Sequence, residues 1–221
     1  MSRVVVVTGG TRGIGRAVAE RFAADRLIAL GRADCDVTDD AAVAETFERI
    51  GPVDVLVNSA GISASAPLAR TSLEDWRSQI DVNATGAFLC TRAVLAGMLE
   101  RGSGRVVTVA STAGRAGARY TAAYSASKHA AVGLMRAVAA EVAGTGVTAN
   151  AVCPAFVRTD MTARSVERIV AATGRSEAEA APLGRLLEPE EVAFAVAFLA
   201  APEAGAINGQ TLILDGGGIQ T

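Results

Sequence analysis

Tyr124 and Lys128 are the two residues of this sequence whose types and spacing could carry out acid-base chemistry. They stand four positions apart at the start of a long alanine-rich segment, and on a helix that spacing puts both side chains on one face. A free tyrosine has a pKa of about 10, and a cation within roughly 4–6 Å lowers a pKa by about 1–3 units. We therefore expect Lys128 to lower the pKa of Tyr124 and make its phenol a usable general acid.

The residue counts favour a functional role for this pair. The chain has 21 basic residues, and Lys128 is the one lysine among them. Arginine could not replace it equally, because a planar guanidinium differs in shape from a compact ammonium. Tyr120, the other tyrosine, has no such partner and is expected to pack or to line a pocket. The alternative for the pair is a chance spacing on a helix surface.

Several hydroxyl groups could hold a substrate oxygen beside this pair. Ser111 follows the apolar run 105–110, which places it at the carboxyl end of a predicted strand, where open α/β sheets bind their ligands. This position favours Ser111. The competing hydroxyls are those of Thr108, Thr112, Ser125 and Ser127.

Two asparagines interrupt apolar segments. Asn58 ends a predicted buried strand and is followed by the small residues Ser59, Ala60 and Gly61, which allow close approach of a flat ligand. Asn83 lies within an apolar helical pattern, where an amide is unfavourable unless it is hydrogen-bonded. Asn83 could cap a kink in the helix or order a water near Lys128.

Short apolar runs alternate with longer helical patterns along the chain, which predicts a doubly wound parallel α/β sheet in a single domain, 1–221. The runs are continuous rather than alternating, as in strands that are buried on both faces. The predicted strands are Val4–Val7, Leu27–Leu30, Val53–Val57, Arg105–Ala110, Val147–Val152 and Thr211–Leu214. The predicted helices are Ile14–Ala24, Ala41–Ile50, Ser72–Glu100, Ala122–Ala143 and Pro189–Ala200.

One crossover is missing from the predicted sheet. Only a few residues separate Leu30 from the next strand candidate, Cys35–Val37, whereas a parallel connection needs a dozen or more. No helix fits there. We expect a sheet one strand narrower than usual, with residues 31–35 running across its carboxyl edge to residues 36–38.

A glycine-rich turn joins the first predicted strand to the first helix. Its main-chain N–H groups and the helix dipole could bind a diphosphate; the candidates are Gly9, Thr11, Arg12, Gly13, Ile14 and Gly15.

No acid stands directly after Leu30, where NAD would need one, whereas Arg12 and Arg32 could hold a 2′-phosphate. We expect NADPH as cofactor rather than NADH. Against this, either arginine could be a solvated surface charge, and Asp34 lies close by.

Composition excludes other classes of function. A net charge of -2 makes nucleic acid an improbable partner, and the N-terminus has no signal-peptide pattern, so we expect a cytoplasmic protein without membrane attachment. Cys35, Cys90 and Cys153 are odd in number and lack C-x-x-C spacing, which argues for buried apolar side chains without a disulfide or a metal. With His129 as the one histidine, a hydrolase triad is excluded.

Residues 158–187 have a weak helical pattern rich in alanine, arginine and acids. We interpret this segment as a lid beside the substrate. The alternative is a long, poorly packed surface excursion.

Taken together, these motifs closely resemble the short-chain dehydrogenase/reductase family over almost the whole chain. The motifs are Thr8-Gly9-x-x-x-Gly13-x-Gly15, Asn58-Ser59-Ala60-Gly61, Asn83, Ser111, Tyr124-x-x-x-Lys128 and Pro154-x-x-Val157-x-Thr159. Several separated motifs in the correct order are more specific than any one of them.

The resemblance implies a role for each of these residues. Tyr124 would be the acid/base, Lys128 would bind the nicotinamide ribose, Ser111 would orient the carbonyl and Asn83 would hold a relay water. Asp36 and Val37 would meet the adenine; Asn58, Ala60 and Gly61 would line the ribose and diphosphate; and Pro154, Val157 and Thr159 would hold the carboxamide side. The family is commonly a homotetramer built on two long helices, here 72–100 and 122–143.

The sequence departs from the family pattern in three places. The missing crossover leaves the adenine side less enclosed, Ser59 replaces a second asparagine, and Ala155 stands where a glycine usually follows the proline.

The runs 124–129 and 148–154 are similar to bacterial 3-oxoacyl thioester and polyketide ketoreductases. The implied function is NADPH-dependent reduction of a ketone, most simply a 3-oxoacyl thioester or related ketide. The alternatives are a dehydrogenase of a free secondary alcohol (steroid, sugar or cyclic alcohol) and a non-catalytic nucleotide-sensing protein.

Overall fold

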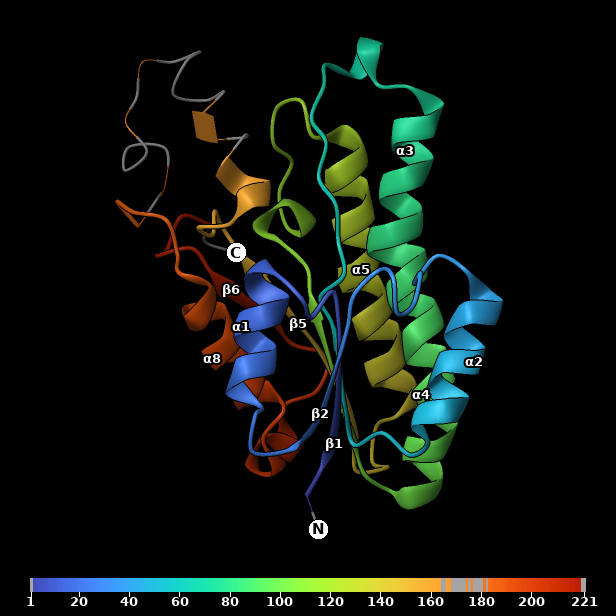
Figure 1. The fold of residues 1–221 in the computed structure, drawn as a ribbon. Coiled ribbons are helices and arrows are strands. Elements are labelled where there is room, and N and C mark those ends of the chain that lie inside the picture. The colour runs from blue at the N-terminus through green and yellow to red at the C-terminus, as the bar shows by residue number, and fades with distance from the viewer. Residues whose placement is uncertain are drawn as a thin grey trace.

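The structure is a computed structural model that describes residues 2–163, 166, 167, 174, 176, 181 and 183–219. Within them, six parallel strands form one sheet in the order β2-β1-β3-β4-β5-β6 (Figure 1). The strands are β1 (Val4–Thr8), β2 (Arg26–Leu30), β3 (Val55–Asn58), β4 (Gly104–Val109), β5 (Val147–Pro154) and β6 (Thr211–Leu214). The order runs outward in both directions from β1 and β3, which confirms the predicted doubly wound sheet.

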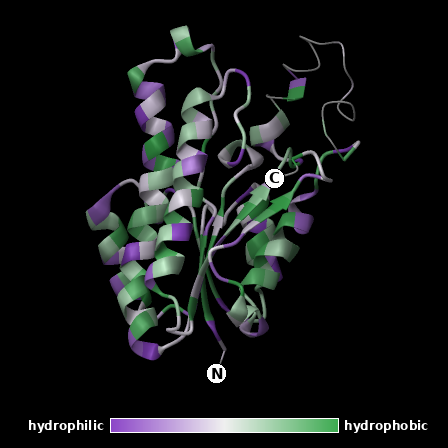
Figure 2. Ribbon diagram, turned by 180° about the vertical axis from the view of Figure 1, so that it is seen from behind, coloured by the Kyte–Doolittle hydropathy of each residue, from purple (hydrophilic) through white to green (hydrophobic). Residues whose placement is uncertain are grey.

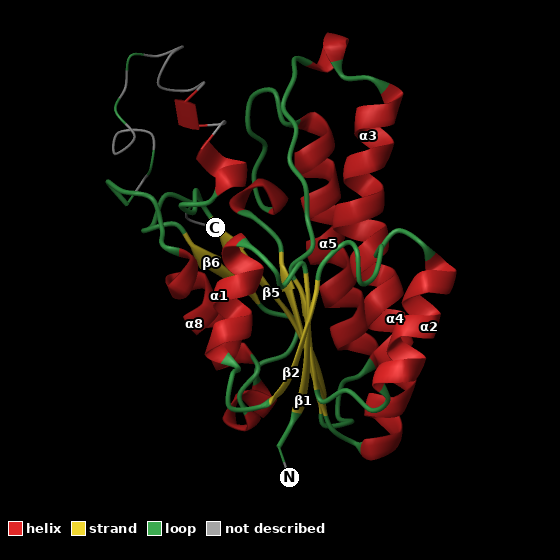
Figure 3. Ribbon diagram, in the orientation of Figure 1, coloured by secondary structure: helices red, strands yellow, loops and turns green. Residues whose placement is uncertain are grey.

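Helices cover both faces of this sheet (Figures 1 and 3). Helices α1 (Gly13–Arg21) and α8 (Pro189–Leu199) lie on one face, and α2 (Asp40–Ile50), α4 (Gly86–Arg101) and α5 (Ala122–Glu141) lie on the other. Helix α3 (Leu73–Ile80) precedes α4 and packs beside α5. Shorter helical turns are η1 (Leu68–Arg70), η2 (Asp81–Thr85), η3 (Thr112–Gly114) and η4 (Pro202–Ala206).

The valine-rich strands supply both halves of the core, which explains why their apolar runs are continuous. Side chains alternate between the two faces, so Val6 packs in the cluster under α2, α4 and α5, whereas Val5 and Val7 pack in the cluster under α1 and α8. All three valines are 0% exposed. Figure 2 shows the hydrophobic residues concentrated in these central strands.

The missing crossover is confirmed. Strand β2 ends at Leu30 and α2 begins at Asp40, so residues 31–39 make the whole connection, and the candidate strand Cys35–Val37 is a loop. Cys35 and Val37 are nevertheless buried, in the same cluster as Val43 of α2. Strand β2 pairs with β1 alone among the described strands and is therefore an edge of the sheet.

The long helix predicted over Ser72–Glu100 begins as expected but changes its winding in the middle. Ser72 caps α3, because its Oγ accepts from the main-chain N–H of Asp75 at 2.9 Å. At Asp81–Thr85 the helix widens into a π turn that joins α3 to α4. Asn83 lies in this turn, and π turns of this kind occur frequently at functional sites.

By length and composition alone, the helical run Leu73–Arg101 could cross a membrane, with a mean hydropathy of 1.3 in its 18-residue window. In this fold 44% of that window is buried, and α4 packs against β3, β4 and α5. A buried core helix passes the same test, so the contacts with the sheet account for its apolar character.

The predicted lid, residues 158–187, falls partly outside the described residues, which omit 164, 165, 168–173, 175, 177–180 and 182. The two ends of the segment lie side by side. The main-chain N–H of Arg158 donates to the carbonyl of Leu187 at 2.8 Å, and that of Leu187 donates to Phe156 at 2.9 Å. Both ends are thereby fixed beside β5 and α8.

Candidate active site

The turn between β1 and α1 has the close packing that only glycines permit. Gly9 and Gly13 have φ of 65° and 51°. A Cβ on Gly9 would lie 2.7 Å from the Cα of Ala60, and one on Gly15 would lie 2.1 Å from the carbonyl oxygen of Gly9. The N-cap of α1, Arg12, makes no side-chain capping bond, and no acid stands in the first turn. The helix therefore begins with N–H groups suited to bind an anion.

The loop after β3 lies directly against this turn. Thr8 Oγ1 accepts from the main-chain N–H groups of Ser59 at 3.2 Å and Ala60 at 3.3 Å. Asn58 Nδ2 donates to the hydroxyls of Thr91 and Thr108, whereas its buried Oδ1 has no hydrogen-bond partner among the described residues. The amide of Asn58 therefore ties β3 to α4 and β4.

Asn83 holds the main chain of the loop after β3. Its Oδ1 accepts from the N–H of Ile62, and its Nδ2 donates to the Ile62 carbonyl and to Ser127 Oγ, each at 2.9 Å. Gly61 lies between two site residues, because a Cβ there would be 3.1 Å from Asn83 Oδ1 and 3.6 Å from Lys128 Nζ. The structure thus brings Asn83, Gly61 and Lys128 together.

Of the five candidate hydroxyls, Ser111 is the one that hydrogen-bonds to the Tyr124 phenol. Thr108 donates to Met135 Sδ in the core, Ser127 donates to the carbonyl of Tyr124, and Ser125 bonds to Thr121. Ser111 also begins η3, where its Oγ accepts from the N–H of Ala113 at 3.1 Å. The position at the end of β4 is therefore the one that meets the tyrosine, as the sequence favoured.

Lys128 is buried, with 6% of its surface exposed, on the same helix as Tyr124. Its Nζ donates to the carbonyl of Val109, at the end of β4, at 2.9 Å and lies 5.9 Å from the centre of the Tyr124 ring. Burial lowers the pKa of Lys128 to about 8. The spacing of four therefore brings the amine and the ring together, as predicted.

The expected direction of the Tyr124 pKa was wrong. Burial is the largest cause and raises the pKa of the phenol above its usual 10, while the hydrogen bond with Ser111 acts in the opposite direction. Desolvation opposes formation of a phenolate, and the amine is directed to Val109 instead of the phenol oxygen. In this structure Tyr124 is a protonated donor whose acidity the lysine does not increase.

Cys153 lies in this site, which the sequence did not indicate. It is fully buried near the end of β5 and receives a hydrogen bond from the Ser111 main chain. A thiolate at this position would raise the pKa of both Tyr124 and Lys128. Burial raises its pKa, so the thiol is neutral and serves as a small packing group. The prediction of a buried cysteine is correct, and only its location is new.

Tyr120 has φ of 65°, a left-handed conformation that is rare for a bulky side chain. Its carbonyl accepts from Ala66 at 2.9 Å, and its ring, 54% exposed, lies under Arg119. It lies two residues before the start of α5 and is exposed rather than packed.

The residues after β5 reach the glycine-rich turn between β1 and α1. A Cβ on Gly13 would lie 3.4 Å from Thr159 Cγ2, so the two loops are in contact. Pro154 ends β5, and Val157 bridges to Leu187 and is 3% exposed. This side of the site is therefore enclosed by β5 and the chain that follows it.

The residues predicted to hold the adenosine lie in the connection after β2, on the other side of the glycine-rich turn. Arg32 Nη2 is 3.3 Å from Asp36 Oδ2, and Asp34 Oδ2 accepts from the N–H of Gly31 at 2.8 Å. Val37 packs tightly on the start of α4, where a Cβ on Gly86 would be 2.7 Å from it. Arg12 and Arg32 are exposed.

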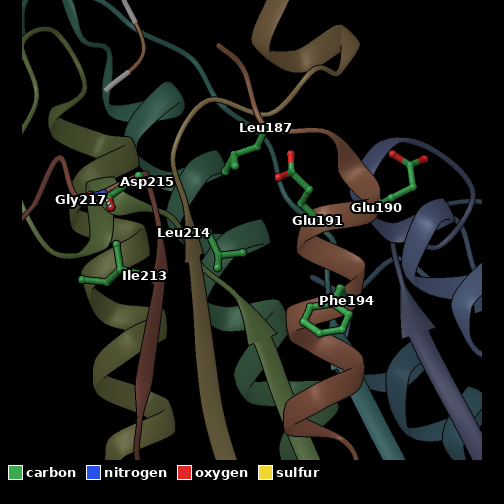
Figure 4. A pocket seen from close by; sticks show the side chains of 9 residues that line it. Leu187, Glu190, Glu191, Phe194, Ile213, Leu214, Asp215 and Gly217 are labelled. Atoms are coloured by element: carbon green, nitrogen blue, oxygen red, sulfur yellow. Dashed lines mark hydrogen bonds between the residues drawn. The ribbon is translucent and has the colours of Figure 1, made fainter. Parts of the chain in front are cut away.

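A pocket of about 570 Å³ lies apart from these residues, between α8 and the end of β6 (Figure 4). Leu187, Glu191 and Leu214 lie on the side of α8 that faces β6, and none of the predicted site residues lines the pocket. Its lining residues are Leu187, Glu190, Glu191, Phe194, Ile213, Leu214, Asp215, Gly216 and Gly217. Among the described residues, no cluster of histidine, cysteine and acids could hold a metal ion.

The arrangement fits a dinucleotide. The glycine turn packs so closely that Cβ atoms at Gly9 and Gly15 would collide with backbone, and the N-terminus of α1 has no acid of its own. The turn lies at the carboxyl edge between β1 and β3, which is the point where the strand order reverses. Tyr124, Lys128 and Ser111 lie at the same edge.

Curated relatives match the chain over almost its whole length. The family profile described as enoyl-(acyl carrier protein) reductase matches residues 24–218. A 3-oxoacyl-[acyl-carrier-protein] reductase of Synechocystis is 39% identical over 246 positions, covering 98% of this chain and 96% of the relative. An acetoacetyl-CoA reductase of Shinella zoogloeoides is 36% identical over 240 positions, covering 98% of each. Both alignments exceed the 221 residues of the chain, so these relatives carry residues that it lacks.

Solved structures are similar over the same extent. A variant of actinorhodin polyketide ketoreductase with NADPH is 37% identical with a TM-score of 0.88, covering 98% of this chain and 97% of that one. A protein of Beutenbergia cavernae assigned as an NAD(P)-dependent gluconate 5-dehydrogenase, with NADP bound at low occupancy, is 41% identical with a TM-score of 0.87, covering 97% and 96%. The chain belongs to the short-chain dehydrogenase/reductase family and is an NAD(P)-dependent oxidoreductase.

Proposed function

We propose that this protein is an NADPH-dependent reductase of a ketone carried on an acyl thioester or a related ketide. The observation that carries the proposal is the meeting of Ser111, Tyr124 and Lys128 at the ends of β4 and α5. The names of the relatives, 3-oxoacyl carrier-protein reductase, acetoacetyl-CoA reductase and polyketide ketoreductase, support the thioester or ketide.

In this proposal Tyr124 is the general acid. When bound, NADPH supplies the hydride that adds to the carbonyl carbon. Tyr124 donates its proton to the carbonyl oxygen, so one hydride and one proton convert the ketone to a secondary alcohol. Ser111, which bonds to the phenol in this structure, would donate a hydrogen bond to the carbonyl oxygen of the substrate and orient it. The raised pKa of Tyr124 keeps the phenol protonated and ready to donate at neutral pH.

Lys128 and Asn83 support this step. Lys128, held by the carbonyl of Val109, would bind the nicotinamide ribose. Asn83 would hold the water that returns a proton. Its side chain is already bonded to Ile62 and Ser127, so the main chain of the π turn would have to hold that water.

The remaining cofactor contacts follow the edge of the sheet. The diphosphate would lie against the first turn of α1, the adenosine between the loops after β2 and β3, and the carboxamide beside the loop after β5. The proposed residues are Gly9, Thr11, Arg12, Gly13, Ile14, Gly15, Arg32, Asp36, Val37, Asn58, Ala60, Gly61, Pro154, Val157 and Thr159. Arg12 and Arg32 would hold the 2′-phosphate of NADPH. The KM values for NADPH and NADH in the wild type and in Arg32→Ala test this, and unchanged discrimination would refute it.

A dehydrogenase of a free secondary alcohol is the second candidate, because a similar structure is assigned to gluconate oxidation. Initial rates of NADPH oxidation with acetoacetyl-CoA and with a panel of simple ketones separate the two. Our proposal predicts a higher kcat/KM for the thioester. A higher kcat/KM for a free ketone or sugar acid would replace it with the second candidate.

We further propose a single cytoplasmic domain whose segment 158–187 covers the substrate, and an assembly of copies, most simply a tetramer. Phe88 and Leu99 on α4 are 42% and 40% exposed, which supports association through the face formed by α4 and α5. Light scattering of the purified protein tests the assembly, and a monomer at all concentrations would contradict it.

A further inference from the structure

The short connection after β2 brings an arginine and an aspartate of the adenosine side into contact. Gly31 anchors the turn, since its carbonyl accepts from the N–H groups of Asp34 and Cys35, each at 3.1 Å. The chain therefore folds back at once, and Asp36 lies 3.3 Å from the Arg32 guanidinium. A sheet with the additional crossover would separate these positions by a helix and a strand.

Asp36 is the fixed member of this ion pair. Its Oδ1 accepts from the Thr38 hydroxyl at 2.7 Å and from the Thr38 N–H at 3.0 Å, and these bonds hold its pKa below the usual value. The side chain of Arg32 is 88% exposed, compared with 36% for that of Asp36. The guanidinium can therefore leave the pair for another anion, while the carboxylate stays ionised in place.

This pair lies beside the phosphate-binding turn. The Gly10 N–H donates to the carbonyl of Leu30 at 3.0 Å, and a Cβ on Gly31 would lie 3.0 Å from Thr11 Cγ2. A dinucleotide whose diphosphate is bound at the start of α1 therefore places its adenosine ribose near Arg32 and Asp36.

We infer that Asp36 is a specificity-determining residue that reduces the preference of this protein for NADPH over NADH. In dinucleotide-binding folds a carboxylate accepts the 2′-hydroxyl of NADH, whereas an arginine binds the 2′-phosphate of NADPH. Here both stand in contact, so the 2′-phosphate must take Arg32 from Asp36 and then lies near a second negative charge. NADH meets neither penalty. The inference rests on the proposed function, in which these residues hold the cofactor.

The test is the affinity of each nucleotide, measured by titration calorimetry without substrate. The probes are two pairs, NADP⁺ with NAD⁺ and 2′,5′-ADP with AMP, and the members of each pair differ only by the 2′-phosphate. Asp36→Asn keeps the shape and removes the charge. We expect it to raise the preference for the 2′-phosphorylated member of each pair about three- to ten-fold, in line with an exposed ion pair of up to about 1 kcal/mol and one like charge.

Asp40→Asn is the matched control, because it also removes one exposed negative charge but the partner of Asp40 is Arg92. It should change the preference less than two-fold. In an Arg32→Ala background, Asp36→Asn should have a smaller effect, because there is no arginine to release and only the like charge of Asp36 remains. Melting curves of all variants establish that they are folded.

Three results would overturn the inference. The first is an unchanged preference in Asp36→Asn, the second is an equal change in Asp40→Asn, and the third is an undiminished effect in the Arg32→Ala background. If the folded wild type binds none of the four nucleotides, the proposed function fails with it. If they bind and the preference does not move, the inference alone fails.

Discussion

The Lys128 amine lies 5.9 Å from the centre of the Tyr124 ring. The same amine donates to the carbonyl of Val109, at the end of the neighbouring strand. Lys128 is buried and Tyr124 is half-buried, and burial raises the pKa of the phenol and lowers that of the amine. The pair therefore consists of a neutral proton donor and a cation that burial has made less stable.

The buried cation makes the stability of the fold depend on pH. Because the pKa of Lys128 falls from 10.5 to about 8 on folding, the unfolded chain binds the extra proton between these values, and stability rises with pH across that interval. Between about pH 7 and 10, the wild type should gain about 2 kcal/mol of unfolding free energy relative to Lys128→Met. Urea unfolding of both proteins at the two pH values measures this.

Comparing the same two proteins at both pH values removes the contributions of other titrating groups to the unfolding free energy. The Lys128→Met variant leaves the Val109 carbonyl without its donor, a cost that does not change with pH. A difference in unfolding free energy that is constant from neutral to alkaline pH would show that the amine keeps its ordinary pKa.

The same ionisation should appear in catalysis. The kcat/KM for NADPH reports the ionisation of the free enzyme. Since the charged amine is the proposed ribose-binding form and its pKa is about 8, kcat/KM should decline above pH 8. Tyr124, whose pKa is raised, contributes no decline in that range. A profile that stays level to pH 9.5 would contradict either this lowered pKa or the role of the charged amine in cofactor binding.

Close packing at Gly15 provides a prediction about cofactor affinity. Gly15→Ala places a Cβ 2.1 Å from the Gly9 carbonyl and must distort the turn, so the Kd for NADP⁺ should rise by about ten-fold or more. Gly133→Ala is the control, since nothing lies within 4 Å of a Cβ on this glycine of α5. Titration calorimetry compares them, and equal affinities in the two variants would contradict the proposed diphosphate site.

The sheet could be predicted closely because its strands are valine-rich and buried on both faces. The prediction for β6, Thr211–Leu214, is identical to the observed strand, and the missing crossover follows from chain length alone. Periodicity could not show the π turn at Asp81–Thr85, in which Asn83 bonds to Ile62, 21 residues earlier in the chain.

The sequence predicts which residues form the site more completely than it predicts their pKa values and ion pairs. Spacing on a helix brings Tyr124 and Lys128 together, and the end of a strand selects Ser111. The direction of the Tyr124 pKa depends on desolvation by the whole fold, and a single sequence does not contain that information. The contact of Arg32 with Asp36 depends equally on the path of residues 31–35.

Asn83 should act through the loop that it holds. Asn83→Ala removes three hydrogen bonds to Ile62 and Ser127, two of them to main chain, and should destabilise the protein by about 1–3 kcal/mol. Because these bonds also position the π turn whose main chain would hold the relay water, kcat should fall as well. Thermal unfolding and steady-state rates separate the two effects, and a variant with wild-type kcat would leave Asn83 a structural residue only.

The most direct measurement is the rate of ketone reduction by Tyr124→Phe at saturating NADPH, with acetoacetyl-CoA as substrate. Phenylalanine keeps the ring and removes only the hydroxyl that bonds to Ser111. We predict a loss of about 10²–10⁴-fold in kcat with the Kd for NADP⁺ nearly unchanged. Turnover at the wild-type rate in this variant would contradict the assignment of Tyr124 as the proton donor.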